Sequence, residues 1–338
     1  MAASTKGVDA ALEGSERVSE PTPAQPRSPA PDGDLAALLP FGAPFLIGDP
    51  AAGRRGLGEL RRRLAQDGVV AEAAVARPPS RAAELAAGAL ARGSRLLVAV
   101  GSDEVAHALV TTLVGVDGPP PHEGVLGLVG LGRQDLAATF GLPDDPERAA
   151  RHLLGGRVFL ADVGRARWRG PDGAERAAVF ANTAELGYPA ETSARQAGRD
   201  PTRRAGRLAT ALRALAASRS TPVRLALDHT TVEFRLAGLV VANGQFSMGR
   251  MKVAPRALPD DGRLSVIAFE GRPLAVYARS KELYYGTHVP HPTVREYQSA
   301  RVEADTAEPL TLALDGVRVP GGPPLRADVL GKALRVKV

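Results

Sequence analysis

Three short acidic turns hold the residue types that could do chemistry in this chain. Gly101-Ser102-Asp103-Glu104-Val105 follows an apolar run, and Asp260-Asp261-Gly262 and Asp315-Gly316 lie farther along the chain. A glycine after a buried strand lets backbone N–H groups approach an anion such as phosphate. Carboxylates and backbone carbonyls are the ligands that a hard cation prefers. Asp-Gly between apolar runs also forms ordinary hairpin turns, so these residues alone leave both interpretations open.

The second of these turns lies in a longer stretch with a recognisable order. Asn243-Gly244 is followed by Lys252–Pro255 (Lys-Val-Ala-Pro) and then by Asp261-Gly262. This order resembles the diacylglycerol kinase catalytic family, which includes bacterial lipid kinases and sphingosine kinases. The resemblance implies a structural Mg²⁺ held by the Asp261 carboxylate and by the carbonyls of Leu258 and Arg263.

The resemblance also assigns the binding of ATP to the first turn, where the family has glycine-glycine-aspartate-glycine-threonine. This chain keeps Gly101 and Asp103, and it has Ser102 at the second glycine. Glu104 adds a negative charge beside a triphosphate, which costs on the order of a few kcal/mol in a partly desolvated site. Val105 has no side-chain donor. Nucleotide binding at this loop is therefore expected to be altered or lost.

A second part of the expected nucleotide site lies at Gly130–Ala137, where the family has proline-x-glycine-threonine-x-asparagine-aspartate. Asp135 is kept, Gln134 replaces the asparagine, and Gly132 and Arg133 occupy the phosphate-binding positions. An arginine near the γ-phosphate would compensate for lost donors. The alternative is that Arg133 is a solvated loop residue.

The third turn lies where the family has aspartate-glycine-glutamate, with the glutamate as the general base for the lipid hydroxyl. Here the residues are Asp315, Gly316 and Val317, and a valine cannot accept a proton. Asp315 could take this role if burial raised its pKa toward neutral. By resemblance, Asp315, Asp103 and Asp135 are the candidate catalytic residues that organise magnesium and water.

Two histidines fall in Lys281–Val294, which resembles the family's glycine-x-histidine and histidine-proline-x-valine connection. His288 and His291 are spaced to lie on one side of an extended segment. Without a predictable third ligand nearby, structural hydrogen bonding is favoured over a metal site. The remaining histidines, His107 among them, form no pattern from which a role follows.

The elements that must position the first turn alternate between strand and helix. The periodicity predicts strands over Pro44–Gly48, Val69–Ala76 and Leu96–Val100, and helices over Leu57–Asp67 and Ser80–Ala91. This alternation indicates an open α/β sheet with right-handed crossovers, and the resemblance implies a domain of the NAD kinase type.

From Val158 onward, short strands separated by Gly, Pro and Asp turns predict an antiparallel β-sandwich. We expect a disordered tail over residues 1–40, an α/β nucleotide-binding domain over 41–156 and a β-sandwich lipid-kinase domain over 157–332. A last strand over 333–338 is expected to return to the first domain.

Arg203–Arg219 has the pattern of a basic amphipathic helix, with Leu208, Leu212 and Leu215 on one side. We favour a helix that simply packs over the sandwich. The alternative is a helix that lies on an anionic membrane surface.

Composition limits the class of protein. The chain has 338 residues, 44% of them hydrophobic, no cysteine and no run of the ~20 apolar residues that a membrane span needs. We expect a soluble cytoplasmic protein with peripheral membrane contact at most. A net charge of +6 favours anionic partners, whereas only 4% aromatic residues argue against nucleic-acid binding. The oligomeric state stays open, a dimer included.

Two functions compete. The first is ATP-dependent phosphoryl transfer to a lipid hydroxyl, on diacylglycerol or a sphingoid base, with Mg²⁺. The second is a degenerate family member that binds lipid, nucleotide or a protein partner without turnover. The departures at Glu104, Arg133 and Val317 all fall at the expected chemistry, which favours the second function slightly.

Overall fold

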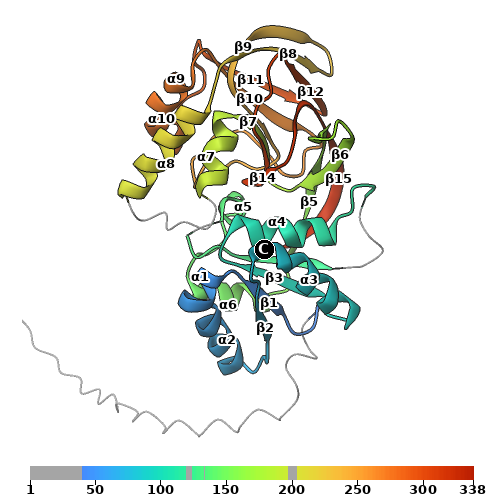
Figure 1. Ribbon diagram of the computed structural model, residues 1–338. Coiled ribbons are helices and arrows are strands. Elements are labelled where there is room, and N and C mark those ends of the chain that lie inside the picture. Colours follow the sequence, from blue (N-terminus) through green and yellow to red (C-terminus); the bar gives the residue numbers. More distant parts are fainter. Residues whose placement is uncertain (1–39, 119–123, 133, 197–203) are drawn as a thin grey trace, which may run out of the picture. The chain divides into compact units, whose positions relative to one another are not determined.

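The computed structural model describes residues 40–118, 124–132, 134–196 and 204–338 (Figure 1). The expected N-terminal tail and the candidate residue Arg133 lie outside the described residues.

The first part of the chain forms a parallel sheet in the order β2-β1-β3-β4. Its strands are β1 (Phe45–Gly48), β2 (Glu72–Val75), β3 (Leu96–Val100) and β4 (Val125–Val129). Every residue of β1, β3 and β4 is buried, as is expected of a parallel sheet covered on both faces. The carboxyl ends of β1, β3 and β4 thus meet at one edge, where open α/β sheets bind ligands.

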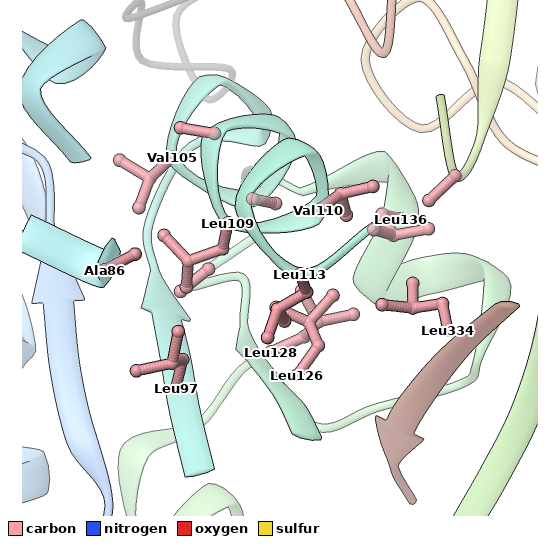
Figure 2. Close-up of a cluster of buried hydrophobic side chains, with 14 of the residues drawn as sticks. Ala86, Leu97, Val105, Leu109, Val110, Leu113, Leu126, Leu128, Leu136 and Leu334 are labelled. Atoms are coloured by element: carbon pink, nitrogen blue, oxygen red, sulfur yellow. The ribbon is translucent and has the colours of Figure 1, made fainter. Parts of the chain in front are cut away.

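Helices cover both faces of this sheet. They are α1 (Pro50–Arg55), α2 (Leu57–Gln66), a 3-10 turn (Pro79–Arg81), α3 (Ala82–Ala91), α4 (Asp103–Leu113), α5 (Asp135–Thr139) and α6 (Pro146–Leu154). On one face Val105, Leu109 and Leu113 of α4 pack against side chains of β3 and β4 (Figure 2). On the other face the leucines Leu60 and Leu64 of α2 pack against the sheet. The predicted α/β layer is therefore confirmed.

The second part is a mostly antiparallel β structure. Its strands are β5 (Val158–Arg169), β6 (Glu175–Phe180), β7 (Thr183–Gly187), β8 (Thr221–Leu227), β9 (Thr231–Ala242), β10 (Leu264–Glu270), β11 (Val294–Ser299), β12 (Arg301–Thr306), β13 (Leu312–Leu314), β14 (Val317–Val319) and β15 (Gly322–Lys337). The run β14-β13-β7-β9-β8-β12-β15 is hydrogen-bonded throughout and does not close into a barrel. Alternate side chains of these strands form a core that includes Phe180, Leu225 and Val241.

The last strand links the two parts. Its first half pairs with β12 through Leu325–Asp328, and most of its length pairs with β5. Near its end Val336 pairs in parallel with Leu126 of β4. One strand thus contributes hydrogen bonds to the antiparallel structure and to the parallel sheet.

Within the described ranges, the helices that accompany the β structure are α7 (Tyr188–Gln196), α8 (Arg204–Ala217), α9 (Pro273–Ala278) and α10 (Ser280–Tyr285). Helix α8 packs on the β part, and of its three leucines only Leu215 is partly buried against a core cluster. Among the α8 side chains that the structure describes, Thr210 and Ala214 are buried, whereas Leu208 and Leu212 are 51% and 53% exposed. Thr210, Ala214 and Leu215 thus face the neighbouring elements, and the other two leucines face outward. Among the described residues, no helix is long and apolar enough to cross a membrane.

Candidate functional site

The ends of β1 and β3 are fitted closely to each other. The Asp49 side chain caps α1 by accepting a 2.7 Å hydrogen bond from the Ala52 N–H. Gly101 has φ +111°, and a Cβ there would lie 2.8 Å from the Ala52 Cβ and 3.0 Å from Asp49 Oδ2. Only glycine fits this approach without displacing its neighbours.

Asp103 connects the loops that follow β3 and β4. Its carboxylate accepts hydrogen bonds from the backbone N–H groups of Asp135 (2.8 Å) and Leu136 (3.3 Å), so it caps helix α5. Gln134 Nε2 donates to the carbonyls of Ala99 and Ser102, both at 3.3 Å. Burial, and then the neighbouring Asp135 carboxylate, raise the pKa of Asp103 well above its usual range. Asp103 thus holds backbone in place.

Asp135 connects α5 to a loop of the β part. Its two oxygens accept hydrogen bonds from the backbone N–H groups of Gly249 and Arg250. The Arg250 guanidinium in turn pairs with Asp144 at 2.7 Å. Burial raises the pKa of Asp135, against the lowering effect of these hydrogen bonds.

Asp315 is the most fully hydrogen-bonded of the three candidate catalytic residues. Oδ1 accepts from the N–H groups of Asn182 (2.7 Å) and Thr183 (3.0 Å). Oδ2 accepts from the N–H of Ala181 (3.0 Å) and from His107 Nδ1 (2.9 Å). The side chain is 5% exposed. An ionised carboxylate has about four lone-pair positions, and four donors occupy them here.

His107 is therefore a site residue that the sequence did not indicate. It lies one turn after Asp103 on α4. Because residues at i and i+4 share one face of a helix, His107 lies on the same face as Asp103. That spacing was the available signal, but no pattern in the sequence pairs His107 with Asp315, which is 208 positions away.

The structure brings the three aspartates into one neighbourhood. Asp103 is subject to the charges of both Asp135 and Asp315, which raise its pKa further. In the part of the chain that the structure describes, no three Asp, Glu or His side chains are arranged to hold a metal ion. These carboxylates are directed at backbone N–H groups instead.

The other expected nucleotide contacts differ in their surroundings. Val105 is fully buried in the core beneath α4. The Ser102 hydroxyl is buried without a hydrogen-bond partner among the described residues. Glu104 is half-buried, and burial and then the Asp49 charge raise its pKa. Gly132 has φ +74° and open space around its Cα.

Glu185 on β7 is a second residue that the sequence analysis missed. It is fully buried, and its Oε1 accepts hydrogen bonds from the hydroxyls of Thr183 (3.0 Å) and Ser247. Its Oε2 has no hydrogen-bond partner within the described residues. Burial raises the pKa of Glu185 to about 7, although the surrounding hydroxyls oppose this shift. A Glu between Ala184 and Leu186 in a strand gives no sequence signal of this environment.

The expected magnesium residues lie on an exposed turn. Leu258, Asp261 and Arg263 are all exposed, and Asp261 Oδ1 accepts a 2.9 Å hydrogen bond from the Arg263 N–H. The adjacent Gly262 N–H donates to the buried Asp162 carboxylate at 2.7 Å. One carboxylate and two carbonyls have the oxygen chemistry that Mg²⁺ prefers, so the donor set fits this ion.

The two histidines of the C-terminal connection have separate partners. His288 is fully buried, and its Nε2–H donates to the Val253 carbonyl at 2.9 Å. His291 Nδ1 accepts from the Thr293 N–H at 3.1 Å. His288 therefore stabilises the loop that contains Val253.

Comparison with known proteins adds two family matches. Residues 45–166 match the diacylglycerol kinase catalytic domain. Residues 184–338 match the YegS C-terminal NAD kinase beta sandwich-like domain. A search of curated proteins finds no match.

Solved structures share the fold. A diacylglycerol kinase from Bacillus anthracis str. Sterne aligns with a TM-score of 0.64 at 16% identity, over 87% of this chain and 96% of that one. A provisionally assigned diacylglycerol kinase from the same strain aligns at 0.66 and 18% identity, with the same coverage. With both domains matched in order and the α/β and β parts present, the chain belongs to the diacylglycerol kinase catalytic-domain family.

Proposed function

We propose that this chain uses the lipid-kinase fold to bind lipid and does not transfer phosphate. The observation that carries the proposal is the set of four donors on Asp315, three backbone N–H groups and His107. A general base must accept the proton of the attacking hydroxyl within hydrogen-bond reach. Asp315 has no lone pair left for that proton, and Val317 has no basic group.

The residues expected to bind nucleotide support the same proposal. Glu104 and Asp49 bring two carboxylates to the first turn of α4, close enough for the Asp49 charge to shift the pKa of Glu104. The positive end of a helix normally favours phosphate, but these two charges oppose a triphosphate. Asp103 and Asp135 already accept backbone hydrogen bonds.

The test combines two measurements on the purified full chain. Labelled ATP and Mg²⁺ are incubated with mixed micelles of diacylglycerol and sphingosine, with an active diacylglycerol kinase as positive control. We expect no label in the lipid and a glycerolipid or sphingoid base in an organic extract of the purified protein. Label transfer by the wild-type chain would overturn the absence of turnover, and an empty extract would overturn lipid binding.

ATP-dependent transfer is the second candidate, and Glu185 favours it. The carboxyl has an unpartnered oxygen and a pKa of about 7, which suits an acid-base catalyst at neutral pH. Ser193, whose hydroxyl also interacts with Glu185, has its Cβ 3.9 Å from the Cβ position of Gly316, beside Val317. If labelled lipid forms and Glu185→Gln abolishes it while Asp315→Asn does not, Glu185 is the base.

We further propose that Asp261, with the carbonyls of Leu258 and Arg263, holds Mg²⁺ as a structural ion. The ion would stabilise the loop by neutralising the Asp261 carboxylate in the turn. Thermal unfolding should shift upward with MgCl₂ for the wild-type chain and for Asp260→Ala, and the shift should disappear for Asp261→Ala. Equal shifts in all three proteins would refute this site.

A further inference from the structure

Helices α8, α9 and α10 expose large apolar side chains. Helix α8 packs against α9, and α9 packs against α10, so the three lie together on the β part (Figure 1). Among their described residues, the exposed large apolar side chains are Leu208 (51%), Leu212 (53%), Leu274 (62%), Tyr284 (48%) and Tyr285 (67%). We call this set the helical apolar face. Single exposed apolar residues are ordinary on protein surfaces, whereas a group on adjoining helices marks an interaction site.

The orientation of α8 gives this face its significance. Thr210 and Ala214 are buried, while Leu208 and Leu212, one turn apart, point away from the core. A helix that only covered the β structure would bury its leucines. Ala214 packs in the same cluster as Val276 of α9 and Leu283 of α10, and the partly buried Leu215 packs against that cluster. Leu208 and Leu212 make no such contact with the core and are left exposed for a partner.

The charges around the helical apolar face select the partner. Arg213, Arg272 and Lys281 are exposed. Across residues 208–219 and 272–285 the only acid in the sequence is Glu282, which pairs with Arg279 at 3.0 Å. A symmetric contact with a second copy would bring these cations together at a cost. An anionic lipid surface instead attracts cations beside an apolar face.

The two tyrosines fit the same partner. The Tyr284 and Tyr285 rings lie 5.9 Å apart in an edge-to-face arrangement, and both are about half exposed or more. Tyrosine has an apolar ring and a polar hydroxyl, and it is enriched where acyl chains meet head groups.

We propose that the helical apolar face docks this protein onto an anionic phospholipid bilayer. Leu208, Leu212 and Leu274 would enter the acyl boundary, and Arg213, Arg272 and Lys281 would contact phosphate head groups. The inference rests on the proposed function in one respect, namely that the partner is lipid. Docking itself requires no phosphate transfer. It would bring the protein to membrane-resident lipids.

The experiment is co-sedimentation of the full chain with vesicles. Vesicles of phosphatidylcholine with phosphatidylglycerol are compared with phosphatidylcholine alone, at low and high salt. We expect preferential binding to the anionic vesicles, weakened by salt. The variant Leu208→Gln/Leu212→Gln should bind at least tenfold more weakly. Its control is Val70→Gln/Leu160→Gln, which replaces two exposed apolar residues elsewhere (80% and 46%) and should bind like the wild type.

A second variant tests the contribution of the cationic side chains. Arg213→Gln/Arg272→Gln/Lys281→Gln should reduce binding to anionic vesicles by about fivefold per residue and leave phosphatidylcholine binding unchanged, whereas Arg61→Gln on α2 should have no effect. The proposal fails if the wild type does not sediment with anionic vesicles or if the leucine variant binds as the wild type does. It also fails if the leucine substitutions convert a dimer to a monomer without changing vesicle binding. Lipid extracted from a chain that does not sediment would refute docking and leave the proposed lipid binding intact.

Discussion

At the scale of single residues, the carboxylates of this chain are used mainly to hold the backbone. Asp103, Asp135 and Asp315 each accept two or more backbone hydrogen bonds. Each bond to a charged acceptor contributes more than a neutral one. Glu185 differs, because hydroxyls rather than N–H groups surround it and one oxygen has no partner among the described residues.

Glu185 should make stability depend on pH. Its pKa is raised from 4.5 to about 7 in the folded chain, so its contribution is fully present below 4.5 and is lost as pH rises through about 7. The loss amounts to roughly 3 kcal/mol. Urea unfolding from about pH 5 to about pH 8 should show the wild type losing stability relative to Glu185→Gln. A difference between the two that is constant with pH would contradict the raised pKa.

Asp315 should matter for stability. Asp315→Ala leaves three buried N–H groups and His107 without their acceptor, which should cost about 2–4 kcal/mol in the free energy of unfolding. It also places alanine at φ +47°, a conformation that Asn and Asp tolerate better. Asp315→Asn should therefore lose less stability than Asp315→Ala in urea unfolding. If both substitutions leave stability unchanged, the hydrogen-bonding role assigned to Asp315 is wrong.

At the scale of elements, the loops after β1, β3 and β4 are fixed by contacts among themselves. The close approach at Gly101 joins the first two loops, and Asp103 and Gln134 join the second and third. The edge of the sheet is therefore preorganised even where its family residues have changed.

Gly101→Ala tests this close fit. The new methyl group would lie 2.8 Å from the Ala52 Cβ at φ +111°, which should cost about 1–3 kcal/mol. Gly132→Ala is the control, because φ is +74° but no atom lies within 4 Å of the new Cβ, and it should cost about 1 kcal/mol. Thermal unfolding of the two variants measures the difference. Equal destabilisation would show that contact with Ala52 is unimportant.

At the scale of the whole molecule, β15 determines how the two parts are coupled. It pairs with β12 and β5 and also with β4. Leu334 on this strand is buried in the same core cluster as Leu126 and Val163. Loss of packing around this strand should therefore destabilise both the parallel sheet and the antiparallel part.

We expect a single cooperative unfolding transition. Trp168, the only tryptophan, lies in β5 and donates to the Pro320 carbonyl at 2.9 Å, so its fluorescence reports on the β part. Circular dichroism reports mainly on helices. Leu334→Ala should destabilise by about 2–5 kcal/mol and move both midpoints together. A shift in circular dichroism with unchanged fluorescence would mean that the parts unfold independently.

Local patterns in the sequence determined the α/β layer, the antiparallel part and the family. Apolar patterning identified the buried strand Leu96–Val100 with its exact bounds, because burial on one face or two imposes a pattern that can be read residue by residue. The retained motifs Asn243-Gly244 and Asp261-Gly262 carried the resemblance to the family. Each is short and contiguous, so it can be recognised without knowing the fold.

Only the tertiary structure decided what the candidate residues contact. The pairing of His107 with Asp315, the hydroxyls around Glu185 and the outward turn of Leu208 and Leu212 depend on segments far apart in the chain. The same leucine spacing suits a helix that faces a core or a membrane, and the same aspartate suits a catalyst or a backbone cap. The neighbours supplied by folding distinguish these roles, since a side chain's available lone pairs and exposed surface are properties of its surroundings.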